Sequence, residues 1–213
     1  FDGSGNLIVV DFFNDCIRKV TSNLVSTLCG SPGNTGSNNG SGSAARFYAP
    51  SGICLENSTS ALVADKNNNS IRRVNLSTGE VSTVISTGIT SPNDVVVVGN
   101  SIFIIENTCI KVFNGTSVSL FCGNETTAGY TNATGNQARF EQLRQAVYSA
   151  SGNCLYVTDE GNNVIRKITL NPAPTVDFSA SPTSATVGQT IVLKENTLFG
   201  ETFTWSITPA NYT

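Results

Sequence analysis

The acidic side chains that recur along the chain are the first candidates for chemistry. Asp11, Asp65 and Asp159 each close an apolar run, and Glu106 stands near the same place in a fourth run. Histidine is absent, so the chain lacks the usual general base near neutral pH and the commonest zinc ligand. A residue that recurs at one place is more readily explained by local turn hydrogen bonds than by one convergent active site. We therefore predict structural roles for these acids, no catalytic residue, no cofactor and no metal.

Charge and composition exclude two classes of partner. The 213 residues include 12 Lys and Arg and 15 Asp and Glu, which gives a net charge of −3 and no basic stripe to neutralise phosphates. The chain has no apolar stretch of the length that crosses a bilayer, although 39% hydrophobic residues suffice for a core. We predict no nucleic-acid partner and no membrane insertion in this segment.

A repeat must position these side chains, and it is visible before any strand is assigned. Its copies share an Ile-(Arg/Lys) pattern and start 54, 39 and 55 residues apart: Ile17-Arg18-Lys19-Val20, Ile71-Arg72-Arg73-Val74, Ile110-Lys111-Val112 and Ile165-Arg166-Lys167-Ile168. A fixed spacing of tens of residues indicates stacked structural units.

The residues around each copy predict a four-stranded meander. An apolar strand ends at the acid, and an Asn-rich turn such as 66–69 or 160–163 follows it, with side chains that tolerate left-handed geometry. A β-branched run such as 24–28 or 81–84 comes after the Ile-Arg segment, and a segment such as 51–55 precedes the next copy. The only helical pattern is a possible turn near 138–143. Four-stranded units at this spacing are typical of β-propeller blades.

The stretch 155–167 resembles the central part of an NHL repeat, and so does 25–30 followed by Ala45-Arg46-Phe47 and 50–53. The resemblance covers about residues 1–170 and implies an all-β fold of NHL-type propeller blades, about four in an incomplete ring. It does not by itself imply an activity. On this fold Arg18, Arg72 and Arg166 are expected on the outer hairpin of each blade, as solvated or inter-blade groups.

The last forty residues differ in kind. Pro172 and Pro174 make 171–174 a stiff connector, and strand-like runs follow at 175–179, 189–193 and 202–207. These runs resemble the first half of a PKD or other immunoglobulin-like sandwich, with Trp205 as the expected core aromatic. We predict a propeller segment over 1–171 and a partial immunoglobulin-like β-sandwich over 172–213.

Both ends of the chain fall inside a predicted unit. The chain opens within the first blade, and the fourth blade lacks an evident outer strand. Either the chain is a segment of a longer parent chain, or neighbouring copies complete each other's sheets through unpaired edge strands. The two explanations are compatible, and the expected partners are therefore other copies of the chain or a longer parent chain.

Two pairs of cysteines are spaced alike, 13 residues apart in each pair and 93 residues from one pair to the other. A two-residue turn at 22–23 gives an antiparallel ladder whose residue numbers sum to 45, which places Cys16 opposite Cys29. A turn at 115–116 likewise sets Cys109 opposite Cys122. Opposed Cβ atoms lie ~4.5–5.5 Å apart, within reach of a disulfide after slight adjustment. We predict both disulfides.

Cys54 and Cys154 remain by elimination. They form a third disulfide, as an oxidising compartment favours, or stay buried as small apolar thiols. No Cys-x-x-Cys spacing suggests a redox function.

Acceptor patterns for N-linked sugar, Asn-x-Ser/Thr, support secretion. They occur at Asn39, Asn57, Asn68, Asn75, Asn114, Asn124, Asn132 and Asn211. On the blade prediction the first seven lie in turns or inter-blade loops, where an oligosaccharide projects into water. We predict a secreted, extracellular or cell-surface glycoprotein that carries covalent glycans.

The expected function is that of a non-catalytic structural or adhesive protein, a self-associating subunit of an extracellular fibre, matrix or surface coat. Ser91-Pro92-Asn93-Asp94-Val95 resembles one strand start of calcium-dependent lactonase-like propellers, and Glu106 is the acid that could join Asp94 at a cation. A lactonase-like enzyme and a ligand-binding receptor ectodomain are therefore the alternatives. Tyr130 is the aromatic residue of the two long loops that could anchor a protein partner.

Overall fold

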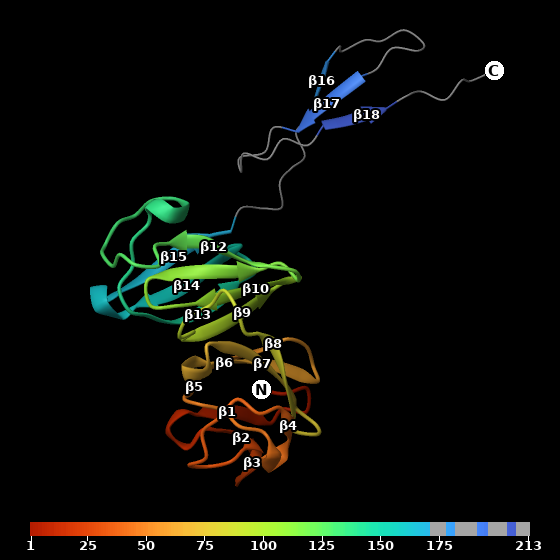
Figure 1. Ribbon diagram of the computed structural model, residues 1–213, viewed down its shortest axis with the longest axis vertical. Helices are drawn as coiled ribbons and strands as arrows, with labels where there is room; N and C mark the ends of the chain where they lie inside the picture. Colours follow the sequence, from red (N-terminus) through yellow and green to blue (C-terminus); the bar gives the residue numbers. More distant parts are fainter. Residues whose placement is uncertain (171–177, 182–190, 196–203, 208–213) are drawn as a thin grey trace, which may run out of the picture. The chain divides into compact units, whose positions relative to one another are not determined.

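The computed structural model describes residues 1–170, 178–181, 191–195 and 204–207. The chain divides into two compact units, Phe1–Thr169 and Leu170–Thr213, which are considered separately. The first unit consists of four antiparallel sheets that follow one another along the chain (Figure 1). Among the described residues no helix is long and apolar enough to cross a membrane.

The sheets of the first unit have the following strands. The first sheet contains β1 (Leu7–Asp11), β2 (Cys16–Thr21) and β3 (Leu24–Gly30); the second contains β4 (Gly40–Ser41), β5 (Pro50–Leu55), β6 (Ser60–Asp65), β7 (Ser70–Asn75) and β8 (Glu80–Ile85); the third contains β9 (Asp94–Val98), β10 (Ser101–Ile105), β11 (Cys109–Phe113) and β12 (Val118–Gly123); the fourth contains β13 (Leu143–Ser149), β14 (Cys154–Asp159) and β15 (Val164–Thr169). Short 3-10 turns are η1 (Phe12–Asn14), η2 (Gly42–Ala44), η3 (Lys66–Asn68), η4 (Gly135–Gln137) and η5 (Glu160–Asn162).

The predicted repeat is confirmed at the level of strands. The four Ile-(Arg/Lys) segments lie in β2, β7, β11 and β15, and each of these strands pairs with the apolar strand before it. The turns that follow the acids are η1, η3 and η5. Each turn ends in a left-handed residue, with φ of 52° at Asp15, 50° at Asn69 and 56° at Asn163. Short polar side chains tolerate this conformation, which is why Asn and Asp recur there.

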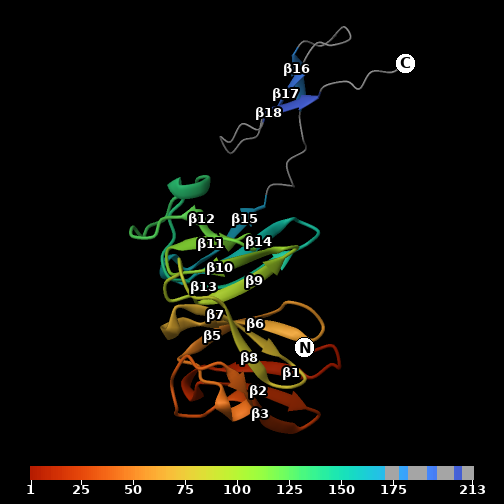
Figure 2. The same cartoon turned by 45° about the vertical axis from the view of Figure 1, so that its right-hand side comes forward.

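The sheets pack face to face through apolar side chains. In β6, Ala61 and Val63 face a cluster that includes Ile17 of the first sheet. Leu62 and Ala64 point to the other face, where their cluster includes Ile104 of the third sheet. β6 is therefore buried on both faces, in agreement with its continuous apolar sequence. The strands β1, β5, β9 and β13 contact one another in this order. Figure 2 shows the sheets stacked in chain order, from the first sheet to the fourth.

The two cysteine hairpins differ from the predicted register by one residue. Near the turns the predicted ladders hold: Arg18 lies opposite Thr27, with residue numbers that sum to 45, and Lys111 lies opposite Leu120, as the turn at 115–116 predicts. A β-bulge then shifts each ladder, so that Cys29 lies opposite Ile17 and Cys122 opposite Ile110. The bulge places one extra residue in β3 and one in β12, so the pairing beyond it is displaced by one residue.

The prediction that Cys16 lies opposite Cys29, and Cys109 opposite Cys122, is therefore wrong. The first cysteine of each pair lies opposite a glycine instead. Gly30 lies opposite Cys16, and Gly123 lies opposite Cys109. All six cysteines have free thiols in the structure. The pairings Cys16–Cys29, Cys109–Cys122 and Cys54–Cys154 stay predictions.

Two further expectations have a clear outcome. The possible helical turn near 138–143 is absent; η4 precedes it and β13 begins at Leu143. In the second unit, β16 (Phe178–Ser181), β17 (Ile191–Glu195) and β18 (Thr204–Ile207) form an antiparallel sheet close to the predicted strand-like runs. Trp205 lies in β18, whereas the connector 171–174 and Asn211 are outside the described residues.

Candidate functional site

The acid that ends β6 forms a buried ion pair with an arginine in β7. Arg72 Nη1 lies 2.8 Å from Asp65 Oδ2, and neither side chain is exposed. The guanidinium also donates to the carbonyl oxygens of Arg46 and Asn38, both at 3.1 Å, and to Asn39 Oδ1 at 2.7 Å. These three residues belong to the long loop between the first and second sheets. The ion pair therefore fastens this loop to the second sheet.

The fourth sheet repeats this arrangement almost atom for atom. Arg166 Nη1 lies 2.7 Å from Asp159 Oδ2, and the guanidinium donates to the carbonyl oxygens of Arg139 and Thr131 and to Asn132 Oδ1. The Tyr130 ring centre lies 5.0 Å from the guanidinium carbon. Tyr130 thus contributes a cation–π contact within the chain.

The first and third sheets have the acid–base pair in a modified form. In the third sheet, Lys111 pairs with Glu106 at 3.2 Å and donates to the Gly88 carbonyl at 3.0 Å, while Thr90 donates its backbone N–H to Glu106. In the first sheet, Arg18 pairs with Asp11 at 3.0 Å, but the side chains are 30% and 26% exposed. The acid–base pair is thus common to all four sheets, and in three of them it holds the loop that precedes the sheet.

Burial and pairing act on the acids in opposite directions. At Asp65, removal from water raises the pKa of the carboxyl, and hydrogen bonds from Tyr48 N–H, Asn68 and Arg72 offset part of that effect. At Asp11, which water reaches, the hydrogen bond from Arg18 holds the pKa below its usual range. In neither place is the carboxylate free to act on a substrate, because its oxygens are already bound within the chain.

The sequence prediction of structural acids named the right residues but missed their partners. The prediction that Arg72 and Arg166 are solvated is wrong, because the structure buries Arg72 completely and leaves Arg166 only 8% exposed. The alternative prediction of inter-blade groups agrees with the structure, since each guanidinium binds the loop between two sheets. A signal for the pairs was present, since acid and arginine are seven residues apart in all three copies. The antiparallel hairpin brings these two positions to one face.

The residues proposed for a calcium site have separate partners. Asp94 Oδ1 accepts the backbone N–H of Val95, and Oδ2 accepts that of Ala146 in β13, both at 2.9 Å. Asn93 donates to the Leu143 carbonyl and to Asn107, while Glu106 belongs to the Lys111 pair. Within the described part of the chain no three acidic, cysteine or histidine side chains form a group that could hold a metal ion.

Asp94 gives the first testable prediction. Burial raises the pKa of its carboxyl from 3.8 to about 6, more than the two backbone hydrogen bonds lower it. Between about pH 4 and pH 6 the carboxyl of Asp94 is protonated in the folded state and ionised in the unfolded state. Its contribution to the free energy of unfolding therefore falls as the pH rises through that range. The cost at pH 7 is about 3 kcal/mol, at 1.36 kcal/mol for each pKa unit.

Asp94→Asn has no charge to bury, so its free energy of unfolding relative to that of the natural protein should rise between pH 4 and pH 7. Urea denaturation at the two pH values measures the difference. Identical pH dependence of the two proteins would show that the carboxyl of Asp94 is not perturbed.

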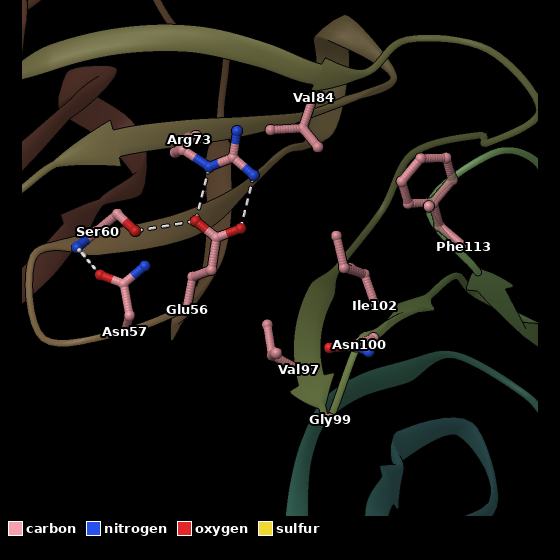
Figure 3. Close-up of a pocket in the computed structure, with 11 residues that line it drawn as sticks. Glu56, Asn57, Ser60, Arg73, Val84, Val97, Gly99, Asn100, Ile102 and Phe113 are labelled. Atoms are coloured by element: carbon pink, nitrogen blue, oxygen red, sulfur yellow. Dashed lines mark hydrogen bonds and ion pairs between the residues drawn. The ribbon is translucent and has the colours of Figure 1, made fainter.

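A cavity lies in a groove between the second and third sheets (Figure 3). Its volume is 720 Å³. One wall is polar: Arg73 and Glu56 form a bidentate ion pair with two hydrogen bonds of 2.6 Å, and Ser60 donates to Glu56 at 2.9 Å. The other wall is apolar and includes Val97, Ile102 and Phe113. No sequence motif pointed to this groove, because its walls come from two different copies of the repeat.

The ion pair between Glu56 and Arg73 holds the polar wall of the groove in place. Arg73 lowers the pKa of Glu56 through its hydrogen bonds, so this carboxylate stays charged and paired. A fixed polar pair facing an apolar wall matches a small molecule with one polar and one apolar side.

Five of the six cysteines are poor nucleophiles in this environment. Burial raises the pKa of Cys29, Cys109 and Cys122 to about 12, and of Cys16 and Cys54 above the usual value. Thiols with such pKa values are protonated at neutral pH and react slowly.

Comparison with known proteins identifies the fold. No protein-family model matches the chain, and no curated protein sequence is similar to it. Among solved structures, a protein described provisionally as a gluconolactonase has a TM-score of 0.55 at 14% identity, over 96% of this chain and 74% of that one. An inactive H270A virginiamycin B lyase from Staphylococcus aureus, with quinupristin, has a TM-score of 0.52 at 17% identity, over 90% and 60%.

Other similar structures are considerably longer than this chain. An auxiliary nutrient binding protein from Bacteroides thetaiotaomicron matches 76% of this chain, which spans only 34% of that protein, with 20% identity and a TM-score of 0.36. At these identities the likeness concerns the fold alone. The structural neighbours are β-propeller proteins, and the four sheets of the first unit are propeller blades.

Proposed function

We propose that the chain is a non-catalytic, secreted glycoprotein built on NHL-type propeller blades, with a structural or adhesive function in an extracellular fibre, matrix or surface coat. One observation carries the proposal: the acids and bases of the repeat bind the chain's own loops. Asp65, Arg72 and Asp159 have no exposed side-chain surface. Side chains in such positions stabilise a rigid platform and leave no reactive group for a substrate.

Unpaired strand edges support self-association. In the described sheets, β1 pairs only with β2, and β15 pairs only with β14. Leu7 and Val9 of β1 are 40% and 37% exposed, and Ile165 of β15 is 64% exposed. An open edge with apolar side chains is a template for strand addition by another copy or by other parts of a longer parent chain. The antiparallel sheet β16–β18 is consistent with the start of an immunoglobulin-like module that would extend such an assembly.

The second candidate is a ligand-binding ectodomain, which the groove between the second and third blades favours. Its polar wall at Glu56 and Arg73 and its apolar wall at Phe113 would orient an amphipathic ligand. A calcium-dependent lactonase has weaker support, because Asp94 and Glu106 bind separate partners.

Light scattering coupled to size-exclusion chromatography distinguishes the two candidates. The mass of the secreted protein should rise with concentration, and Leu7→Lys should reduce that rise by placing a charge on the open edge. Tyr156→Lys is the control, because Tyr156 is also 40% exposed but lies in the central strand β14. A monomeric mass at every concentration would contradict self-association and favour the receptor.

A further inference from the structure

Five of the eight acceptor asparagines fall into two groups by the hydrogen bonds of their side-chain amides. We propose that oligosaccharides occupy Asn57, Asn75, Asn114 and Asn124, and that Asn68 carries none although its sequence has the same acceptor pattern. This assignment rests on the proposed secretion of the chain.

The four proposed carriers share one local geometry. In each, the amide oxygen accepts hydrogen bonds from the backbone N–H groups two and three residues later, and the amide nitrogen donates to no partner among the described residues. The pairs of N–H groups are those of Thr59 and Ser60 for Asn57, Ser77 and Thr78 for Asn75, Thr116 and Ser117 for Asn114, and Thr126 and Thr127 for Asn124, with distances from 2.8 to 3.0 Å. These Asx turns use the oxygen for folding and leave the nitrogen available.

The available nitrogen is the atom that the modification consumes. Transfer from a lipid-linked oligosaccharide diphosphate forms a bond between sugar C1 and Asn Nδ2 and breaks the bond between C1 and the diphosphate oxygen. The amide loses one proton, and the lipid diphosphate leaves. The product keeps one N–H and the carbonyl oxygen, so a carrier retains the hydrogen bonds of its Asx turn.

Asn68 has the opposite arrangement. Its amide nitrogen donates to the Gly36 carbonyl at 2.6 Å and to Asp65 Oδ2 at 2.8 Å, so both hydrogens are used. A sugar on this nitrogen would replace one hydrogen and place its ring between η3 and the loop that contains Gly36. The modification would therefore break a hydrogen bond to the buried Asp65–Arg72 pair and displace the loop.

The repeat explains why asparagine stands at this position. Asn14 and Asn162 occupy the same place in the first and fourth blades, and each donates its amide nitrogen to the acid of its own blade, Asp11 or Asp159. Neither is followed by Ser or Thr two residues later. The asparagine is thus required by the fold. Ser70, which completes the acceptor pattern of Asn68, is 4% exposed, and its hydroxyl has no partner among the described residues.

The proposed sugars have a defined placement on the second and third blades. Asn57 and Asn114 lie in the turns β5–β6 and β11–β12, and Asn75 is the last residue of β7, where the turn β7–β8 begins. These three turns are at the same end of their meanders. Asn57 and Gly115, the neighbour of Asn114, line the groove. Asn57 lies at the edge of the polar wall in Figure 3. Sugars at Asn57 and Asn114 would therefore stand at the rim of the groove.

Hydroxyl variants test the assignment without altering any acceptor asparagine. The chain is secreted from a eukaryotic host, and its intact mass is measured before and after peptide:N-glycosidase. Thr59→Ala, Ser77→Ala, Thr116→Ala and Thr126→Ala should each lose the mass of one glycan, whereas Ser70→Ala should lose none. Ser70→Ala should melt at the same temperature as the natural protein or higher, because it removes a buried hydroxyl without a partner. Asn68→Gln should melt lower.

The outcomes separate this assignment from the proposed function. A glycan found at Asn68 in the folded, secreted protein, or a full mass retained by the four carrier variants, would overturn the assignment and leave secretion intact. A secreted protein with no glycan at any position would overturn both the assignment and the proposed glycoprotein. A protein that carries the expected glycans but keeps a monomeric mass at every concentration would overturn the proposed function alone.

Discussion

Replacing Arg72 with methionine should lower the free energy of unfolding by about 3–5 kcal/mol, because it leaves the Asp65 carboxylate buried without its charged partner. The pair is fully buried at 2.8 Å, and the guanidinium also binds Asn38, Asn39 and Arg46 of the adjoining loop. All of these hydrogen bonds are lost together. Urea denaturation at neutral pH, followed by circular dichroism, measures the change.

The repeat supplies a matched control for this variant. Arg18 stands at the same position in the first blade and pairs with Asp11, but the two side chains are 30% and 26% exposed. Among the described residues its guanidinium donates to Asp11 and Thr27 and to no residue of a preceding loop. Arg18→Met should therefore cost only about 0–1 kcal/mol. Equal losses for the two variants would mean that burial and loop contacts do not set the strength of the pair.

Gly52→Ala should destabilise the protein by about 3 kcal/mol, at the upper end of the cost of overpacking. A Cβ atom at Gly52 would lie 2.1 Å from Asp94 Oδ1 and 2.7 Å from Asp94 Cα. The second distance involves backbone, so rotation of the Asp94 side chain cannot relieve the clash. The inner strands β5 and β9 would have to separate, which opens the interface between the second and third blades.

Gly99→Ala is the control for the general effect of adding a methyl group. Gly99 has a φ of 57° and nothing within 4 Å of the position of a Cβ atom, so the substitution costs only the left-handed conformation. We expect Gly99→Ala to lower the free energy of unfolding by about 1–2 kcal/mol, the cost of that conformation for alanine. Thermal melting of the two variants measures the difference. A smaller drop in melting temperature for Gly52→Ala than for Gly99→Ala would contradict the close packing of β5 on β9.

The sequence predicts local structure well here because each unit repeats the same short-range pattern. The strand that ends at Asp65, the left-handed Asn69 and the strand that begins at Ser70 all follow from neighbouring residues. The register near the cysteines could not be predicted, because the bulges after Ile17 and Ile110 shift the ladder without any local sequence signal that we recognise.

The candidate sites were harder to predict because their parts are distant in sequence. Arg72 meets Asn38 and Asn39 across 34 and 33 residues, and the groove joins Arg73 to Phe113 of another blade. The acceptor pattern at Asn68 is a different case: the pattern is present in the sequence, but only the contacts with Gly36 and Asp65 show that the amide nitrogen is occupied.

Turnover of a lactone by the secreted protein in the presence of calcium, before and after addition of EDTA, tests most directly whether the chain performs chemistry at a cation held by Asp94 and Glu106. We predict no turnover above that of Asp94→Asn and no effect of EDTA. Calcium-dependent turnover that EDTA abolishes and Asp94→Asn removes would contradict the proposed function.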